Sequence, residues 1–179
     1  MALRGSARGR SLVRMVELTD TRRALLESIA EEFLHNSWRG RRLVAVEGGS
    51  EAHAARLADD LAAILFERGE RAVRVSVGDV DEPALRHDTI EPFRAGTLAG
   101  AEDDDTILVV DGRRLLNRSV RGIWHFTIWT LAGDELPHDG VNVDVDVTDE
   151  SAPSRYFYDL CKLPPSIGER RAEPAERRA

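Results

Sequence analysis

The sequence is poor in lysine and in cysteine. It has one lysine, Lys162, among 25 basic residues, so any chemistry that needs a lysine ammonium group has one candidate in the whole chain. It has one cysteine, Cys161, which excludes an internal disulfide and a zinc site built from cysteines. Such cysteine usage is typical of a reducing compartment, and we expect a cytoplasmic protein.

Other missing features exclude further classes of protein. No stretch approaches 18 consecutive apolar residues, and the basic start of the chain lacks an apolar segment, which argues against a membrane span and a secretory signal. The formal net charge is −7, whereas a general nucleic-acid binder presents a basic face. The histidines are scattered and show no metal-ligand spacing. We therefore expect no membrane partner, no nucleic-acid partner and no metal site.

The two ends of the chain differ in composition from its middle. Residues 1–14 are rich in arginine, glycine and serine and have no apolar period, and Met15 is a second candidate for the natural start. Residues 169–179 carry mixed charges in the run ERRAEPAERRA. We predict a disordered basic leader over 1–14, a single domain over 15–168 and a disordered tail over 169–179.

Apolar runs alternate with amphipathic segments along the middle of the chain. Helices are predicted at 19–36, capped by Asp20 or Thr21, at 51–69, at 88–96 as a short helix or turn, and at 153–161. Strands are predicted at 42–48, 72–77, 106–112, 125–132 and 141–149. The last strand alternates apolar with polar residues, which indicates a half-exposed strand near an edge. This order predicts an α/β fold with a parallel sheet of about five strands, whose ligands bind at the carboxyl ends of the strands.

The first predicted strand ends in two glycines, Gly48 and Gly49, directly before an amphipathic helix. Counted from Gly48, the phosphate-loop pattern G-x-x-x-x-G-K-[ST] places its glycine, its lysine and its hydroxyl at His53, Ala54 and Ala55. A dinucleotide-binding pattern fits worse, because its further glycines are absent and the next strand-end acid comes too late. The candidate nucleotide-binding residues are those of this degenerate loop: Glu47, Gly48, Gly49, Ser50, Glu51, Ala52, His53, Ala54 and Ala55.

Several segments of the chain resemble the P-loop uridine kinase-like proteins of actinobacteria. The pair EG at 47–48 enters the loop, GDV places Asp79 at the end of the second strand, and DG places Asp111 at the end of the third. The run VDVTDESAP, with Asp149 and Pro153, resembles the segment that borders the adenine. This resemblance implies a three-layer P-loop kinase-like fold, with Asp79 as the catalytic carboxylate and Asp111 as a magnesium ligand.

Other parts of that family are missing from this chain. The stretch from Ile90 to Thr106 covers, in 17 residues, the place of a long substrate-binding insert. Residues 122–154, where the family carries an arginine-bearing lid, hold seven acids and no lysine or arginine, which would repel a triphosphate. Gly78 replaces the first acid of the second motif.

The combined losses predict a protein with little or no phosphotransfer that serves as a binding or interaction module without a cofactor. Its expected partner is an unknown protein or a second copy of the chain, paired through the strand at 141–148. The alternative is a weak ATP-dependent nucleoside or small-metabolite kinase that uses Asp79 and Asp111 with ATP and magnesium. Simpler interpretations stay open for single residues: Asp111 as a cap of the next turn, Asp79 as a polar strand end and His53 as a solvated first-turn residue.

Overall fold

A computed structural model describes residues 18–157 of the chain. They form a six-stranded sheet in the order β2-β3-β1-β4-β5-β6, in which the first five strands run parallel and β6 is antiparallel to β5. The strands are β1 Arg42–Gly48, β2 Arg71–Asp79, β3 Thr106–Arg113, β4 Phe126–Leu131, β5 Val143–Asp146 and β6 Ser154–Arg155. The predicted α/β fold with a mainly parallel sheet is confirmed. The predicted leader and tail, Cys161 and Lys162 lie outside the described residues.

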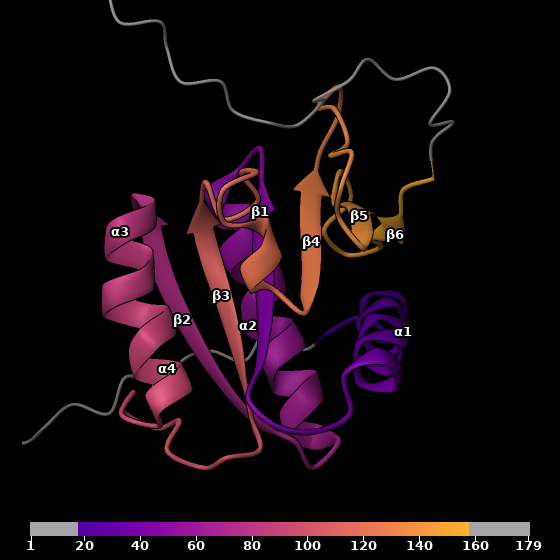
Figure 1. Ribbon diagram of the computed structural model, residues 1–179. Coiled ribbons are helices and arrows are strands. Elements are labelled where there is room, and N and C mark those ends of the chain that lie inside the picture. The colour runs from indigo at the N-terminus through magenta and orange to yellow at the C-terminus, as the bar shows by residue number, and fades with distance from the viewer. Residues whose placement is uncertain (1–17, 158–179) are drawn as a thin grey trace, which may run out of the picture.

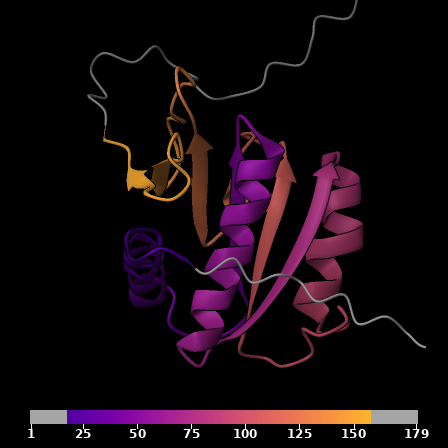
Figure 2. The same cartoon turned by 180° about the vertical axis from the view of Figure 1, so that it is seen from behind.

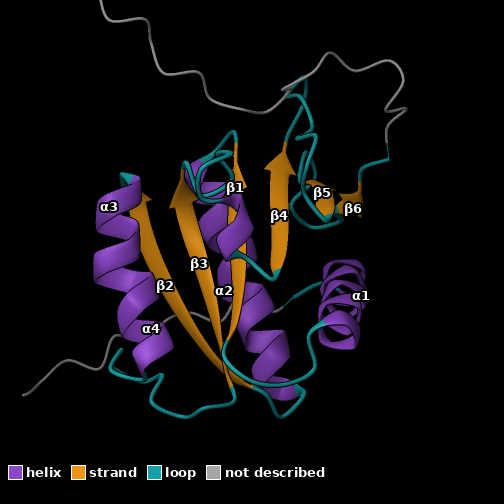
Figure 3. Cartoon of the chain, viewed as in Figure 1, coloured by secondary structure: helices purple, strands orange, loops and turns teal. Residues whose placement is uncertain are grey.

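Helices cover both faces of this sheet and give the domain three layers (Figures 1 and 2). Helices α1 Asp20–Asn36 and α2 Glu51–Glu67 lie on one face. The other face carries one helical segment made of α3 Glu82–Leu85, a π-helical turn Arg86–Ile90 and α4 Glu91–Ala95 (Figure 3). A single 3₁₀ turn, Arg121–Ile123, lies between β3 and β4. Helix α1 is capped by Thr19, whose hydroxyl accepts a hydrogen bond from the Arg22 N–H at 3.2 Å, so the predicted caps were one or two residues late.

Two hydrophobic cores fill the spaces between the layers. Successive strand residues point to opposite faces of a sheet, so β1 sends Val44 and Val46 toward α1 and α2, and Leu43 and Ala45 toward the opposite layer. The first core is completed by the apolar faces of α1 and α2. The second is completed by α3, α4 and the segment between β3 and β4. Strands β1 and β3 are almost continuously apolar because both of their faces are buried.

The last two strands differ from the sequence-based prediction. The strand predicted as half exposed is buried at Val143, Asp144 and Val145, because Val143 and Val145 join the first core and Asp144 accepts a hydrogen bond from the backbone N–H of His138 at 2.9 Å. The final helix predicted from residue 153 is wrong within the described range. Strand β6 forms there and pairs with the outer edge of β5.

Among the described residues, no helix is long and apolar enough to cross a membrane.

Candidate functional site

The candidate site lies at the carboxyl end of β1, where the connection to α2 is short. Strand β1 ends at Gly48 and α2 begins at Glu51, so only Gly49 and Ser50 separate them. Ser50 is the N-cap of α2 and its hydroxyl accepts a hydrogen bond from the His53 N–H at 3.5 Å. The predicted loop residues from Glu51 to Ala55 therefore belong to the first turns of the helix, and Ala54 is buried in the core.

Both glycines of this turn face close neighbours from the segment that begins with β4. A Cβ atom on Gly48 would lie 2.0 Å from the Thr130 hydroxyl and 2.4 Å from its carbonyl oxygen. A Cβ atom on Gly49 would lie 2.2 Å from a carboxylate oxygen of Glu135, and that carboxylate also accepts a hydrogen bond from the Ala132 N–H at 2.8 Å. The turn is therefore packed against β4 and covered by an acidic side chain, which disfavours a phosphate at this position.

Glu47, the last side chain before the glycines, holds the segment that follows β3. Its carboxylate is buried and accepts hydrogen bonds from the backbone N–H groups of Arg114 at 2.8 Å and Leu116 at 3.0 Å. Charge-assisted bonds to backbone donors are among the stronger hydrogen bonds in proteins. The structure thus gives Glu47 an architectural contact, by which the end of β1 fixes the course of residues 114–116.

Asp79 ends β2 and is held by an arginine. Arg114 approaches it in two-point geometry, with Nε 2.9 Å from one carboxylate oxygen and Nη2 3.1 Å from the other. Arg114 has a backbone φ of 64°, in the left-handed region that few residues other than glycine adopt. Two nitrogens of one guanidinium thus engage the Asp79 carboxylate, so both of its oxygens already have an internal partner.

Asp111 lies at the end of β3 and points to the α2 face of the sheet. It accepts a hydrogen bond of 2.9 Å from the Ser76 hydroxyl, and its other oxygen is 2.8 Å from a guanidinium nitrogen of Arg74. Burial raises the pKa of the Asp111 carboxyl, while Ser76 and Arg74 act in the opposite direction. The expected magnesium ligand is therefore neutralised by a cationic side chain of the same protein.

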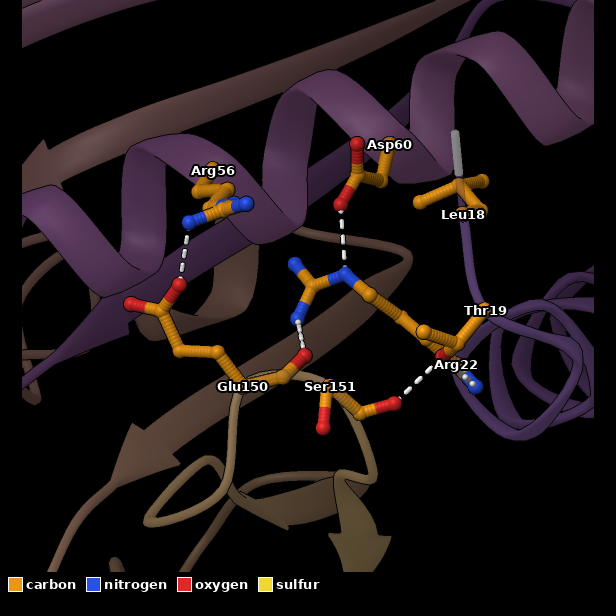
Figure 4. A pocket seen from close by; sticks show the side chains of 7 residues that line it. All are labelled: Leu18, Thr19, Arg22, Arg56, Asp60, Glu150 and Ser151. Atoms are coloured by element: carbon orange, nitrogen blue, oxygen red, sulfur yellow. Dashed lines mark hydrogen bonds and ion pairs between the residues drawn. The ribbon is translucent and has the colours of Figure 1, made fainter. Parts of the chain in front are cut away.

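His53, Arg56 and Glu150 form a second cluster, between the first turns of α2 and the segment after β5. The Glu150 carboxylate lies 3.2 Å from His53 Nε2 and forms an ion pair with Arg56. Beside it is a cavity of about 180 Å³ between α1, α2 and the segment after β5, shown in Figure 4. Its charges are balanced internally, since Arg22 donates to Asp60 at 2.6 Å and Arg56 pairs with Glu150. The cavity thus has no excess positive charge with which to attract an anion.

Asp149 and Pro153, which resemble the adenine border of the kinases, lie on the segment between β5 and β6. The Asp149 carboxylate accepts hydrogen bonds from the Ser151 hydroxyl and N–H, and these bonds lower the pKa of Asp149. This is a local turn stabilised by its own side chain. Among residues 18–157, no group of three or more histidine, cysteine or acidic side chains is arranged to hold a metal ion. The residues at the turn and at Asp111 do not fit a magnesium–nucleotide complex, because an acid and an arginine fill these positions.

The sheet order and the position of the turn define the class of fold. A parallel sheet in the order β2-β3-β1-β4-β5, with a glycine turn from β1 into the following helix, is a P-loop kinase-like fold. No known protein family and no curated protein matches the sequence. Among solved structures, the chain is similar to a proposed uridine kinase from Bacillus stearothermophilus, with a TM-score of 0.52 and 15% identity over 63% of this chain and 82% of the other. It is also similar to a proposed fructose transport system kinase from Silicibacter, with a TM-score of 0.43 and 20% identity over 60% and 75% of the two chains.

Sequence reasoning placed Glu47, Asp79 and Asp111 at one edge of the sheet but missed the groups that engage them. The sequence signal for Arg74 is its charge between Val73 and Val75 in the strand predicted at 72–77, since a partly buried charge favours a counter-charge nearby. The signal for Glu135 is its place in the acidic run that replaces the lid. Neither signal names the partner residue, because both partners are distant in sequence.

Proposed function

We propose that this chain is a uridine kinase-like P-loop protein with little or no phosphotransfer activity and that it serves as a binding or interaction module. The observation that carries the proposal is the closed turn after β1. Only two residues separate β1 from α2, and the Glu135 carboxylate lies directly against Gly49. A phosphate-binding loop instead surrounds an open space with backbone N–H groups and a lysine. A cytoplasmic location and kinship with the actinobacterial proteins are part of this proposal and are supported by the sequence motifs and the single cysteine.

The charges around the turn support the same conclusion. Arg113 is 3.1 Å from a carboxylate oxygen of Glu51, and Arg114 is held by Asp79. Both arginines near the turn are therefore neutralised by acids of the same protein. A triphosphate would have to compete with these two pairs, each worth about 1 kcal/mol or less, and would still face the Glu135 carboxylate.

The segment that follows β4 supports a role in binding other molecules. Leu136 is 60% exposed and stands next to Glu135, at the edge of the sheet where α/β proteins bind ligands. An exposed apolar residue within an acidic loop suits a contact with an apolar and basic protein surface. The partner is an unknown protein or a second copy of the chain. Because β6 covers the outer edge of β5, pairing of two copies through residues 141–148 would first displace β6.

The proposal is tested by titrating the full chain with ATP and magnesium in a calorimeter, followed by assays of ATP-dependent product formation with uridine and a panel of nucleosides. We expect no heat of binding and no product. Micromolar affinity together with uridine turnover would overturn the proposal. A product that disappears in Asp111→Asn, but persists in the exposed control Asp88→Asn, would establish the alternative of a weak kinase using Asp79 and Asp111. Light scattering across a range of concentrations distinguishes a second copy from a different partner.

A further inference from the structure

Strand β2 is the free edge of the sheet. Within residues 18–157 its only strand partner is β3, and no loop hydrogen-bonds to its backbone. Figures 1 and 2 show it as the last strand on the side of the sheet opposite β5 and β6. None of its nine residues is buried, and the one register shift in its pairing with β3, between Ser76 and Gly78, lies near its end. The N–H and C=O groups on its outer side can therefore pair with a further strand.

Helix α2 adds an apolar surface beside this edge. Asp59 of α2 lies 2.9 Å from Arg74 of β2, so the side of the helix that carries Asp59 is the side next to the free edge. Ala55, Ala63 and Phe66 share that side, because they are three to eight positions apart in steps of three or four along the helix. Phe66 is 72% exposed, and α1 packs on a different side of α2. An exposed aromatic ring thus borders an unpaired strand.

We propose that two copies of this chain associate through β2, with the two β2 strands antiparallel and one sheet continuous across both copies. This inference deepens the proposed function, since it rests on the role of the chain as an interaction module and names a second copy as its partner. A two-fold axis brings the same surface of both copies together. The two α2 helices then run in opposite directions, so Phe66, near the end of one helix, lies on the side of the small residue Ala55, near the start of the other.

The charges at the two ends of β2 favour a second copy over an unrelated strand. Arg71 begins the strand and Asp79 ends it, and their side chains are 72% and 48% exposed. In an antiparallel pair the start of one strand lies beside the end of the other, so each Arg71 approaches the Asp79 of the other copy. Their present partners, Asp103 and Arg114, also lie at the surface and can share these contacts. The edge is therefore complementary to itself.

The middle of β2 carries no unbalanced charge that would oppose this pairing. Many edge strands avoid association by means of a charged side chain. Arg74 is the one charged residue inside the strand, and it is held by acids of its own copy, 2.8 Å from Asp111 and 2.9 Å from Asp59. On the opposite face of the strand, Val73 and Val75 are only partly buried against the second core. A second copy would cover these valines.

The test measures self-association of the full chain by sedimentation equilibrium over a range of concentrations. We expect the wild type to form a dimer with a Kd of about 1–100 µM. Phe66→Glu places a charge in the proposed interface and should weaken the dimer at least about tenfold. Phe157→Glu is the matched control, because it makes the same substitution at a side chain that is 86% exposed beyond β6, at the other edge of the sheet. It should leave the Kd unchanged.

Two further measurements place the contact on β2. Arg71→Glu should weaken the dimer about tenfold at low salt, because a two-fold interface contains each residue twice and the change reverses a charge at both ends of the paired strands. Backbone amides within residues 71–79 should exchange hydrogen more slowly as the dimer forms. Exchange in β3, which is already paired on both sides, should not change with concentration.

Three results would overturn the inference. The first is a wild-type chain that stays monomeric at about 1 mM. The second is a dimer that is lost in Phe157→Glu and kept in Phe66→Glu, and the third is a dimer whose formation leaves exchange at 71–79 unchanged, since the two copies would then meet elsewhere. ATP-dependent turnover by a dimer paired through β2 would contradict the proposed function alone. A monomer that neither binds nor hydrolyses ATP would contradict this inference alone.

Discussion

The Glu47 carboxylate accepts a hydrogen bond of 2.8 Å from the backbone N–H of Arg114 and so joins the end of β1 to the segment after β3. Its second oxygen accepts from the N–H of Leu116 at 3.0 Å. A residue that the sequence placed in a nucleotide loop is thus a buried acceptor for two backbone donors. Its substitution should therefore affect folding, whatever the protein binds.

We predict that Glu47→Gln destabilises the protein by about 2 kcal/mol, because the amide keeps one acceptor and presents a donor to the second N–H. Glu47→Ala should cost at least as much, since both buried N–H groups lose their acceptor. Urea unfolding measures the two changes. Glu51→Gln is the exposed control on the same edge and should change stability by less than about 0.5 kcal/mol. An unchanged midpoint in Glu47→Gln would contradict the role of Glu47 as the acceptor for these two N–H groups.

The two glycines of the turn should respond differently to alanine. Gly48→Ala places a methyl group against the backbone of β4 at Thr130 and should cost about 1–3 kcal/mol. Gly49→Ala meets only the flexible end of Glu135, which can move aside, and should cost less than about 1 kcal/mol. The difference in unfolding free energy between the two variants is the measurement. Equal costs would show that the first glycine is not required by close packing with β4.

His125 should make stability depend on pH below neutrality. Its Nδ1 accepts a hydrogen bond from the Leu43 N–H at 3.1 Å, which only the neutral ring can do. Burial, and then the charges of Arg94 and Arg42, lower the pKa of His125 in the folded state. The neutral ring therefore stabilises the fold fully above the unfolded pKa of about 6.5, and this stabilisation is lost as the pH falls through the lower folded pKa.

His125→Asn keeps an acceptor near the same position and cannot titrate in this range, so the difference in unfolding free energy between wild type and variant isolates this histidine. We expect the wild type to lose stability relative to the variant as the pH is lowered below about 6.5. Chemical denaturation at a series of pH values measures the difference. A difference that stays constant with pH would refute the role assigned to the ring.

Arg42 is fully buried and is bound by two acids. A comparison of the stabilities of variants in this group should reveal the cost of an unpaired buried charge. Its Nη2 lies 2.9 Å from Glu70 and 2.8 Å from Asp105, while backbone carbonyls accept from its other nitrogens. Replacing both acids by amides leaves the cation without counter-charge and should cost about 3–5 kcal/mol. Arg42→Met should cost less, because the two partly exposed acids can turn to water. The unfolding free energies of the double-amide variant and of Arg42→Met, each compared with the wild type, test this order. A larger loss of stability in Arg42→Met would contradict the prediction.

Sequence alone determined the layered fold and the nature of the first turn. Apolar runs at 42–48 and 106–112, separated by an amphipathic helix from 51, require only local periodicity to be recognised, and a serine before Glu51 is a local cap. The sequence also shows directly that the loop contains no lysine. The resemblance also placed Asp79 and Asp111 at strand ends, where the structure has them.

Only the tertiary structure decided which groups meet those residues. Glu135 reaches Gly49, Arg74 reaches Asp111 and β6 pairs with β5 through contacts between segments that are distant in the chain. Periodicity and capping depend on residues that are close in sequence, so the sequence is enough to locate the helices and strands. The partner of a buried charge depends on strand order, register and the packing of α2 on the sheet, and these arise only when the whole domain folds.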